Sequence, residues 1–202
     1  EFDGTWPYLT AIAEAAGVHD PLDADVVKSY WVGGPLLDRL NPESLLDALN
    51  RAFTGQVTGL LADLPNPTGV LAHHSFHVFV VYPWVRFLER NAATALQVMQ
   101  NCRIRWGIVE SVDHQAAVIA SRPLVFDGDV LALGDAVTEP VRWSSLTAAP
   151  QPGDTVSAHW HRVCDTLTAA DTAALAAATQ TTLDLVNSTR NTTIHPLRGG
   201  RS

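Results

Sequence analysis

Apolar-rich segments in the first hundred residues are separated by residues that begin or end helices. Gly17 can end a first helix, Asp23 is a candidate N-cap for a second, and Asn41-Pro42 opens a third with a capping amide and a proline in the first turn. The predicted helices cover 7–16, 23–31, 44–53, 70 to about 90 with a kink at Pro83, and 92–100, which runs up to Cys102. Residues 1–101 are therefore predicted to form an all-helical domain.

The pattern changes at Cys102, where apolar and polar residues begin to alternate. Ile104, Trp106 and Ile108 are separated by charged or small residues, which is the period of a β-strand. Further short strands are predicted over 115–120, 125–129, 130–133, 137–143 and 155–161, with turns at Asp113-His114 and Asp127-Gly128. Strands of this length and spacing are typical of a small closed or half-closed barrel, predicted over 102–165.

An alanine-rich segment over 166–187 follows the predicted barrel. Its aspartates and its leucines divide between two sides, so we predict a helix that packs on the barrel or on the helical domain. The polar residues 188–202 are predicted to form a flexible tail. The expected fold class is therefore α+β: an N-terminal all-helical domain, a small β-barrel and a C-terminal helix.

Composition narrows the classes of partner. The 202-residue chain is 47% hydrophobic, which is enough for a substantial core. Its formal net charge is −8 and its basic residues are scattered, so a nucleic-acid partner is not expected, because phosphate binding needs a dense basic patch. No uninterrupted apolar run reaches the length of a membrane span, so no membrane partner is expected either.

The N-terminus lacks the basic and apolar regions of a signal peptide. The chain also opens without Met inside an ordered segment, so we expect upstream residues to be missing. Nothing else indicates secretion, and the two cysteines are expected to be free thiols in a reducing cytosol, which predicts a cytoplasmic protein. A disulfide or a shared metal between Cys102 and Cys164 is the alternative, although a packed thiol at Cys164 is the simpler interpretation.

Cys102 and His159 are the first candidates for chemistry, because one begins the predicted barrel and the other lies on its last strand. Thiolate is a soft ligand and imidazole a borderline one, so the pair suits zinc, copper or low-spin iron. Two protein ligands are too few for a closed structural site, so the pair would form an open one. From the residues alone, an ordinary buried thiol and an ordinary barrel histidine are the favoured interpretation.

Two sequence motifs shift the interpretation of Cys102 and His159 toward a metal site. Cys102, Gly107 and Val109 match a Cys-x-x-x-Pro-Gly-x-Val pattern, with Trp106 in the place of the proline. Downstream, a Gly-Asp-x-Val-x-x-His pattern is matched by Gly153, Asp154, Val156 and His159. With these motifs in this order before a C-terminal helix, residues 102–187 resemble the hydrogenase assembly chaperone family of the HypC and HybG type.

The resemblance implies a small barrel and an iron site. It implies that Cys102 and His159 bind the iron that becomes the Fe(CN)2(CO) half of a nickel–iron site. Zinc is the fallback metal, because a thiolate and an imidazole suit it as well. The implied partners are the hydrogenase large subunit or other maturation proteins. The whole chain is also similar to an actinobacterial family associated with nickel–iron hydrogenase gene clusters.

The chain departs from that family in two places. The family's cysteine is an exposed N-terminal residue, whereas Cys102 is internal and follows a predicted helical domain. Residues 130–146 also read as an insertion. Both departures bear on whether this chain docks the family's usual partners.

Further histidines are candidate ligands. On the predicted helix, His73 and His77 are four residues apart and share a face, a spacing that suits a metal, while His74 points about 100° away. The alternative is a set of histidines packed at a helix interface. His161 alternates with His159 on the predicted strand, so it is either a second ligand or a solvent-facing residue.

Three functions follow. The first is an accessory protein for nickel–iron hydrogenase maturation that binds or scaffolds iron at Cys102 and His159, with His73 and His77 lining the site. The second is a His/Cys metalloenzyme that acts on a small molecule, such as a one-carbon or diatomic ligand. In it His73, His77 and His159 form the metal site, and Cys102 is a ligand or a nucleophile. The third is a metal-free protein-interaction module. A phosphate-binding loop, a nucleophile elbow and a zincin motif are all missing, which argues against a self-contained hydrolase or kinase.

Overall fold

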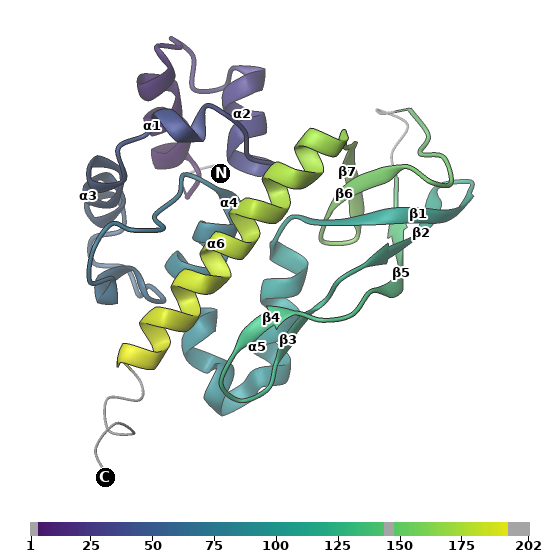
Figure 1. Ribbon diagram of the computed structural model, residues 1–202. Helices are drawn as coiled ribbons and strands as arrows, with labels where there is room; N and C mark the ends of the chain where they lie inside the picture. Colours follow the sequence, from purple (N-terminus) through teal and green to yellow (C-terminus); the bar gives the residue numbers. More distant parts are fainter. Residues whose placement is uncertain (1–3, 144–147, 194–202) are drawn as a thin grey trace.

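The computed structural model describes residues 4–143 and 148–193 and confirms the α+β fold class. Helices gather in one half of the molecule and a β-barrel forms the other (Figure 1). The helical elements are α1 (Trp6–Ala16), α2 (Ala24–Trp31), η1 (Leu37–Arg39), α3 (Pro42–Ala52), η2 (Leu61–Asp63), α4 (His74–Phe76), η3 (His77–Val81), η4 (Pro83–Phe87), α5 (Leu88–Cys102) and α6 (Ala169–Thr193). The strands are β1 (Arg105–Asp113), β2 (Ala116–Ser121), β3 (Leu124–Phe126), β4 (Leu131–Leu133), β5 (Val137–Arg142), β6 (Thr155–His159) and β7 (Arg162–Thr166).

The helix signals read from the sequence act as predicted. Gly17 ends α1 in the left-handed conformation, with a φ of 71°. The carboxylate of Asp23 accepts a hydrogen bond from the Asp25 N–H at the start of α2, and the Asn41 amide oxygen accepts one from the Ser44 N–H at the start of α3. These local bonds satisfy backbone donors that have no partner inside the helix.

The predicted continuous helix from Val70 to Arg90 is wrong, because this stretch is broken into short pieces, although the predicted irregularity at Pro83 is present. His73 is extended, α4 and the π-helical η3 follow, and Tyr82 is again extended before the 3-10 turn η4. Pro83 explains the second break, since it lacks an N–H and pushes the residue before it out of the helical region. The η3 segment is entirely buried, so its apolar run reflects core packing rather than one long helix.

The barrel is closed, with the strand order β1-β2-β5-β7-β6. Neighbouring strands are antiparallel except β5 and β7, which pair in parallel at one position, Arg142 with Arg162. Alternate inward residues fill the interior, a cluster formed by Val109, Ala117, Ile119, Val141, Val156 and Ala158. The structure thus confirms the prediction of a small barrel, although the strand bounds differ from those predicted.

The predicted last strand over 155–161 is two residues too long, and a further strand that the sequence does not predict follows it. β6 ends at His159, and the chain turns through Trp160 and His161 into β7. Trp160 takes a left-handed φ of 51°, which is uncommon for a bulky residue and carries no glycine signal that sequence reading could use.

The β3–β4 hairpin leaves the barrel and packs on the helical half. It forms its own two-stranded sheet, and Leu124 and Leu131 belong to the helical core. The predicted barrel over 102–165 therefore includes a hairpin that serves the other half. Residues 144–147, at the end of the predicted insertion, lie outside the described residues.

Helix α6 crosses the molecule diagonally, from beside the β6–β7 end of the barrel along the helical half (Figure 1). It continues past the predicted end at Asn187, so residues 188–193 are helix rather than tail, and residues 194–202 lie outside the described part. Arg190 is buried there, and its guanidinium donates to the Asp129 carbonyl across 2.8 Å. That bond joins α6 to the β3–β4 hairpin.

Candidate functional site

Cys102 and His159 lie at the same end of the barrel. Cys102 is the last residue of α5 and His159 the last residue of β6. The Trp160 N–H, next to His159, donates to the carbonyl oxygen of Asn101, next to Cys102, across 2.8 Å. The helical half joins the same point, since His74 Nε2–H donates to the Cys102 carbonyl at 2.8 Å. The fold therefore places the two residues that the sequence singled out at the same end of the barrel, with their neighbours Asn101 and Trp160 joined by a backbone hydrogen bond.

The Cys102 thiol is half-buried against the helical core. Burial raises its pKa above the usual range, because a thiolate is less well solvated there. Tyr82 lies close enough that a Cys102 thiolate would further raise the tyrosine pKa, which burial already raises. At neutral pH the residue is thus a protonated thiol, which must lose its proton before it can bind a metal.

His159 is held neutral. Its ring lies 5.5 Å from Trp31 and 5.4 Å from His74, measured between ring centroids. Burial lowers the pKa of His159, the Cys102 backbone partly opposes this shift, and the charge of Arg105 lowers the pKa further. A neutral imidazole is the form that can bind a metal.

His73 does not share a helical face with His77, so that prediction is wrong. It precedes α4 with an extended backbone, and its Nδ1 accepts a hydrogen bond from the Ser75 N–H at 3.0 Å. This bond leaves the proton of the neutral ring on Nε2. Burial lowers the pKa of His73 to about 4, with the Val32 backbone opposing the shift only in part. His73 therefore acts as a helix cap.

His74 has a hydrogen bond at each ring nitrogen. Because Nε2–H donates to Cys102, Nδ1 is the acceptor, and the Tyr30 hydroxyl donates to it at 3.0 Å. The His74 ring also packs on Trp31, with 4.4 Å between centroids. Burial is the main reason that its pKa lies well below the usual range. His74 thus connects the helical half to the end of α5.

His77 is also buried, and its neighbours are Tyr8 and Tyr82. Its Nδ1 lies 3.3 Å from the Tyr8 hydroxyl, and its ring is 4.5 Å from that of Tyr82. Burial lowers the pKa of His77 to about 4. Its ring centroid is 6.2 Å from that of His74.

These side chains form a continuous ring cluster that reaches from the helical core to the barrel. Its members are Tyr8, Tyr30, Trp31, Phe53, His74, His77, Tyr82 and His159. Within residues 4–143 and 148–193, no three or more His, Cys, Asp or Glu side chains are grouped so that they could hold a metal ion. His73 and His77 are therefore not joined to Cys102 and His159 as one ligand set.

The tyrosines of the cluster were not singled out by sequence reading. Tyr8 and Tyr30 are both fully buried. A buried hydroxyl and a buried imidazole each need a hydrogen-bond partner, and here each supplies the other. The sequence indicates such tyrosine–histidine hydrogen bonds only through the presence of several tyrosines and histidines in apolar helical segments. It does not show which tyrosine pairs with which histidine.

The remaining candidates lie on the barrel surface. His161 is exposed in the β6–β7 turn rather than on a strand, and Cys164 is exposed on β7. Both cysteines are free thiols, so the alternative of a Cys102–Cys164 disulfide is wrong. Neither His161 nor Cys164 belongs to a group of metal ligands in the described part of the chain.

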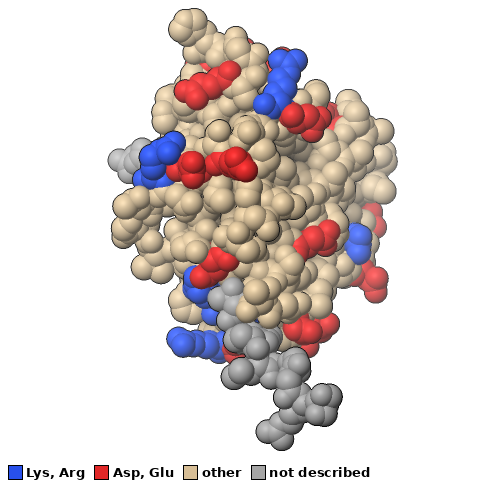
Figure 2. All heavy atoms as spheres, turned by 60° about the vertical axis from the view of Figure 1, so that its left-hand side comes forward, with Lys and Arg blue, Asp and Glu red and all other residues tan. Residues whose placement is uncertain are grey.

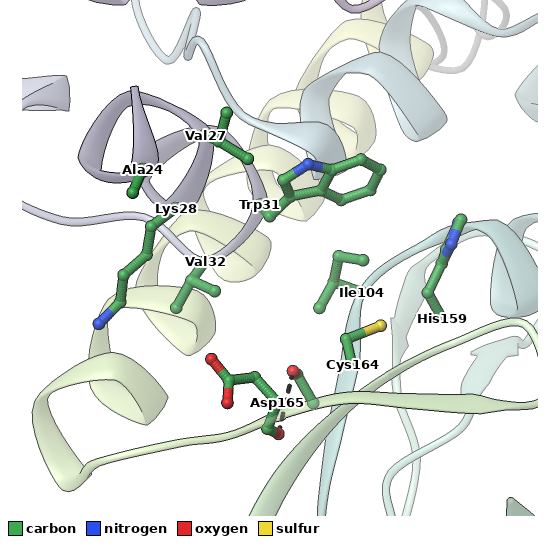
Figure 3. Close-up of a pocket in the computed structure, with 10 residues that line it drawn as sticks. Ala24, Val27, Lys28, Trp31, Val32, Ile104, His159, Cys164 and Asp165 are labelled. Atoms are coloured by element: carbon green, nitrogen blue, oxygen red, sulfur yellow. Dashed lines mark hydrogen bonds between the residues drawn. The ribbon is translucent and has the colours of Figure 1, made fainter. Parts of the chain in front are cut away.

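A cavity of about 540 Å³ opens between α2 and the barrel. Figure 3 shows Trp31 and His159 on either side of it, with the Cys164 sulfur pointing toward His159 and Lys28 near the other end. The lining residues are mainly apolar and comprise Ala24, Val27, Lys28, Trp31, Val32, Ile104, Ser157, His159, Cys164 and Asp165. The Lys28 ammonium forms an ion pair with Asp171 across 2.8 Å. One edge of the candidate site is therefore open to a small molecule.

Buried positive charge lies close to the candidate site, where burial and then the Arg105 guanidinium lower the pKa of His159. Arg103 and Arg105 are each 1% exposed, and the single carboxylate of Glu139 pairs with Arg105 at 2.7 Å. Burial, followed by repulsion from Arg105, lowers the pKa of Arg103 to about 9. Burial would raise the pKa of Glu139, but hydrogen bonds from Arg105 and Ser121 bring it below its usual value. Because the two guanidinium groups carry more positive charge than Glu139 neutralises, this network favours an anionic group nearby.

The surface carries no comparable concentration of charge on the side shown in Figure 2, where acidic and basic side chains lie singly or in small groups among uncharged residues. Among the described helices, none combines the length and hydrophobicity that crossing a lipid bilayer requires.

Comparison with curated proteins and with solved structures gives no match to this chain. One family model matches residues 1–193, which is nearly the whole chain and includes the helical half, the barrel and α6. The protein therefore belongs to the family of unknown function DUF6390.

Proposed function

We propose that this protein is an accessory protein of nickel–iron hydrogenase maturation, and that it holds iron as cargo at Cys102 and His159. The observation that carries the proposal is that these two residues lie at the same end of a closed barrel that is followed by a helix. This is the arrangement implied by the resemblance to the hydrogenase assembly chaperones. The matched residues Gly107 and Val109 lie on β1, and Val156 lies on β6 next to β1.

The donor set fits a cargo metal better than a resident one. A thiolate and an imidazole would leave several positions of a low-spin iron free for small ligands and for a receiving protein. His159 is already in its neutral form, whereas Cys102 must release a proton on binding. An iron that carries cyanide and a thiolate is anionic, and the excess positive charge of Arg103 and Arg105 over Glu139 would stabilise it.

The helical half would then control access to the cysteine. His74 fixes the carbonyl of Cys102 and packs against the His159 ring. In the proposed role this contact would hold Cys102 in a fixed position, unlike the N-terminal cysteine of the chaperone family. The metalloenzyme alternative receives less support, because it needs His73 and His77 as ligands, and His73 already uses its Nδ1 as a helix cap.

The test is the metal content of protein purified without oxygen. We expect iron by elemental analysis, together with infrared bands in the CO and CN stretching region. Cys102→Ala and His159→Ala should each lose most of the iron. His161→Ala is the matched control, because it removes the same imidazole group from an exposed position nearby, and it should retain the iron. Full iron in Cys102→Ala would overturn the assignment, and iron or zinc without those bands would favour the enzyme.

A further inference from the structure

A second hollow lies at the β6–β7 turn, which directly follows the candidate iron ligand His159. It has a volume of about 610 Å³. Its lining consists of Ala116, Pro140, Val141, Arg142, Trp160, His161 and Arg162. It lies at the seam of the barrel, where β5 and β7 pair only through Arg142 and Arg162 and where the Arg142 N–H donates to the His161 carbonyl at 2.7 Å.

The hollow is basic in a chain whose net charge is −8. Arg142 and Arg162 are both exposed and pair directly across two strands, so their side chains leave the sheet on the same side. Within residues 4–143 and 148–193, neither guanidinium makes an ion pair or a side-chain hydrogen bond. Two like charges placed opposite each other are unfavourable unless an anion compensates them. Exposed His161 adds a third group that is cationic when protonated.

Trp160 gives the hollow an apolar, fixed wall. The residue is 46% exposed, and its backbone is held in the left-handed conformation, which costs free energy for such a residue. Two bonds maintain this conformation: the Trp160 N–H donates to Asn101, and its carbonyl accepts from the buried guanidinium of Arg105. The fold thus holds a large aromatic side chain at the surface beside two arginines.

We infer that this hollow, formed by Arg142, Trp160, His161 and Arg162, is a docking site for an acidic segment of a partner protein. Guanidinium groups bind carboxylates through paired hydrogen bonds, and tryptophan and arginine dominate the binding energy of many protein interfaces. Trp160 offers contact area that a free inorganic anion would leave unused. The inference does not depend on iron, because none of the four residues is assigned as an iron ligand.

The test uses a fluorescein-labelled deca-glutamate peptide, with binding followed by fluorescence anisotropy at low ionic strength. We expect the Arg142→Gln/Arg162→Gln variant to bind about tenfold more weakly. Trp160→Asn should weaken binding by about threefold or more, and asparagine suits the test because it tolerates the left-handed backbone. The matched control is Arg51→Gln/Arg90→Gln, which removes the same charge from exposed positions in the helical half and should bind like the wild type.

Three outcomes would overturn the inference. The first is no peptide binding by the wild-type protein. The second is equal weakening in the two double variants, which would mean attraction by overall charge alone. The third is complete displacement of the peptide by inorganic phosphate at a matched charge concentration, which would identify a small-anion site. Iron content measured on the same samples should stay unchanged, so a failure here is distinguishable from a failure of the proposed iron role.

Discussion

The backbone N–H of Trp160 donates to the carbonyl oxygen of Asn101 across 2.8 Å, and this bond joins the β6–β7 turn to the end of α5. The residue before Trp160 is His159 and the residue after Asn101 is Cys102. One backbone hydrogen bond between segments far apart in the chain therefore holds the residues next to both candidate iron ligands together, beside the bond from His74 to the Cys102 carbonyl. Because both Trp160 and Asn101 bond through backbone atoms, no residue type in the sequence predicts this hydrogen bond between them.

The reactivity of Cys102 should depend on pH in a way that reports its burial. Burial raises the pKa of this thiol, so the thiolate fraction should be small at neutral pH and grow only above the range of a free cysteine. We expect the iodoacetamide alkylation rate of Cys164→Ala, in which Cys102 is the remaining thiol, to rise through an apparent pKa higher than that of glutathione. An apparent pKa below that of glutathione would contradict the buried, uncharged environment. Iron binding should release protons and strengthen with pH for the same reason.

The stability of the protein should fall as the pH drops from neutral toward 4. His73 and His77 have folded-state pKa values of about 4, whereas the unfolded chain binds protons near 6.5. The unfolded state therefore takes up more protons in this window. The contribution of these residues to stability is complete above about pH 6.5 and is lost progressively as the pH falls toward 4.

At pH 5 the loss should be about 2 kcal/mol for each histidine. Urea unfolding at pH 7, 6 and 5 measures it. His73→Asn keeps an oxygen that can accept from the Ser75 N–H, so it should weaken the pH dependence while preserving the cap. Gln115→Asn is the control, because Gln115 is exposed and does not titrate, and it should leave the slope unchanged. An unaltered slope in His73→Asn would show that other groups cause the acid sensitivity.

Glu139 should be important for stability although it is only partly buried. It is the carboxylate that balances Arg105 and is close enough to raise the pKa of Arg103. Glu139→Gln would leave two buried guanidinium groups without a counter-charge, and loss of one partner of a buried pair costs about 3–5 kcal/mol. Glu110→Gln, an exposed position on β1, should change the free energy of unfolding by less than about 0.5 kcal/mol. Similar values for the two variants would mean that the arginines are solvated.

Local signals in the sequence predicted much of this fold. Asp23 and Asn41 cap helices through bonds to residues two and three positions away, so their effect is readable from neighbours. The alternation after Cys102 predicted the barrel because the side chains of a strand alternate between its two faces. The pairing of Cys102 with one end of the barrel came from the motif order, which reflects family architecture rather than local chemistry.

What could not be predicted depends on contacts between distant segments. The run 77–81 is apolar enough for a helix, but its π-helical form comes with bonds from the Gly59 and Leu60 N–H groups to the Val81 and Val80 carbonyls. The roles of His73 and His74 depend on Ser75, Tyr30 and Cys102, and only the folded chain brings the last two close. A turn at Trp160 is equally hidden, because tryptophan is not a turn residue and the conformation is maintained by Arg105 and Asn101.

Gly107, one of the residues that match the chaperone motif, should tolerate no side chain. A Cβ atom at this position would lie 2.6 Å from the carbonyl oxygen of Ala120 on the neighbouring strand β2, well inside contact distance. Because the obstacle is backbone, relief requires β1 and β2 to move apart, and overpacking of this kind costs about 1–3 kcal/mol. We expect Gly107→Ala to lower the free energy of unfolding by that amount in urea denaturation. Ile108→Ala, at the adjacent but exposed position, should cost less than about 1 kcal/mol, and an equal loss in both variants would argue against the steric explanation.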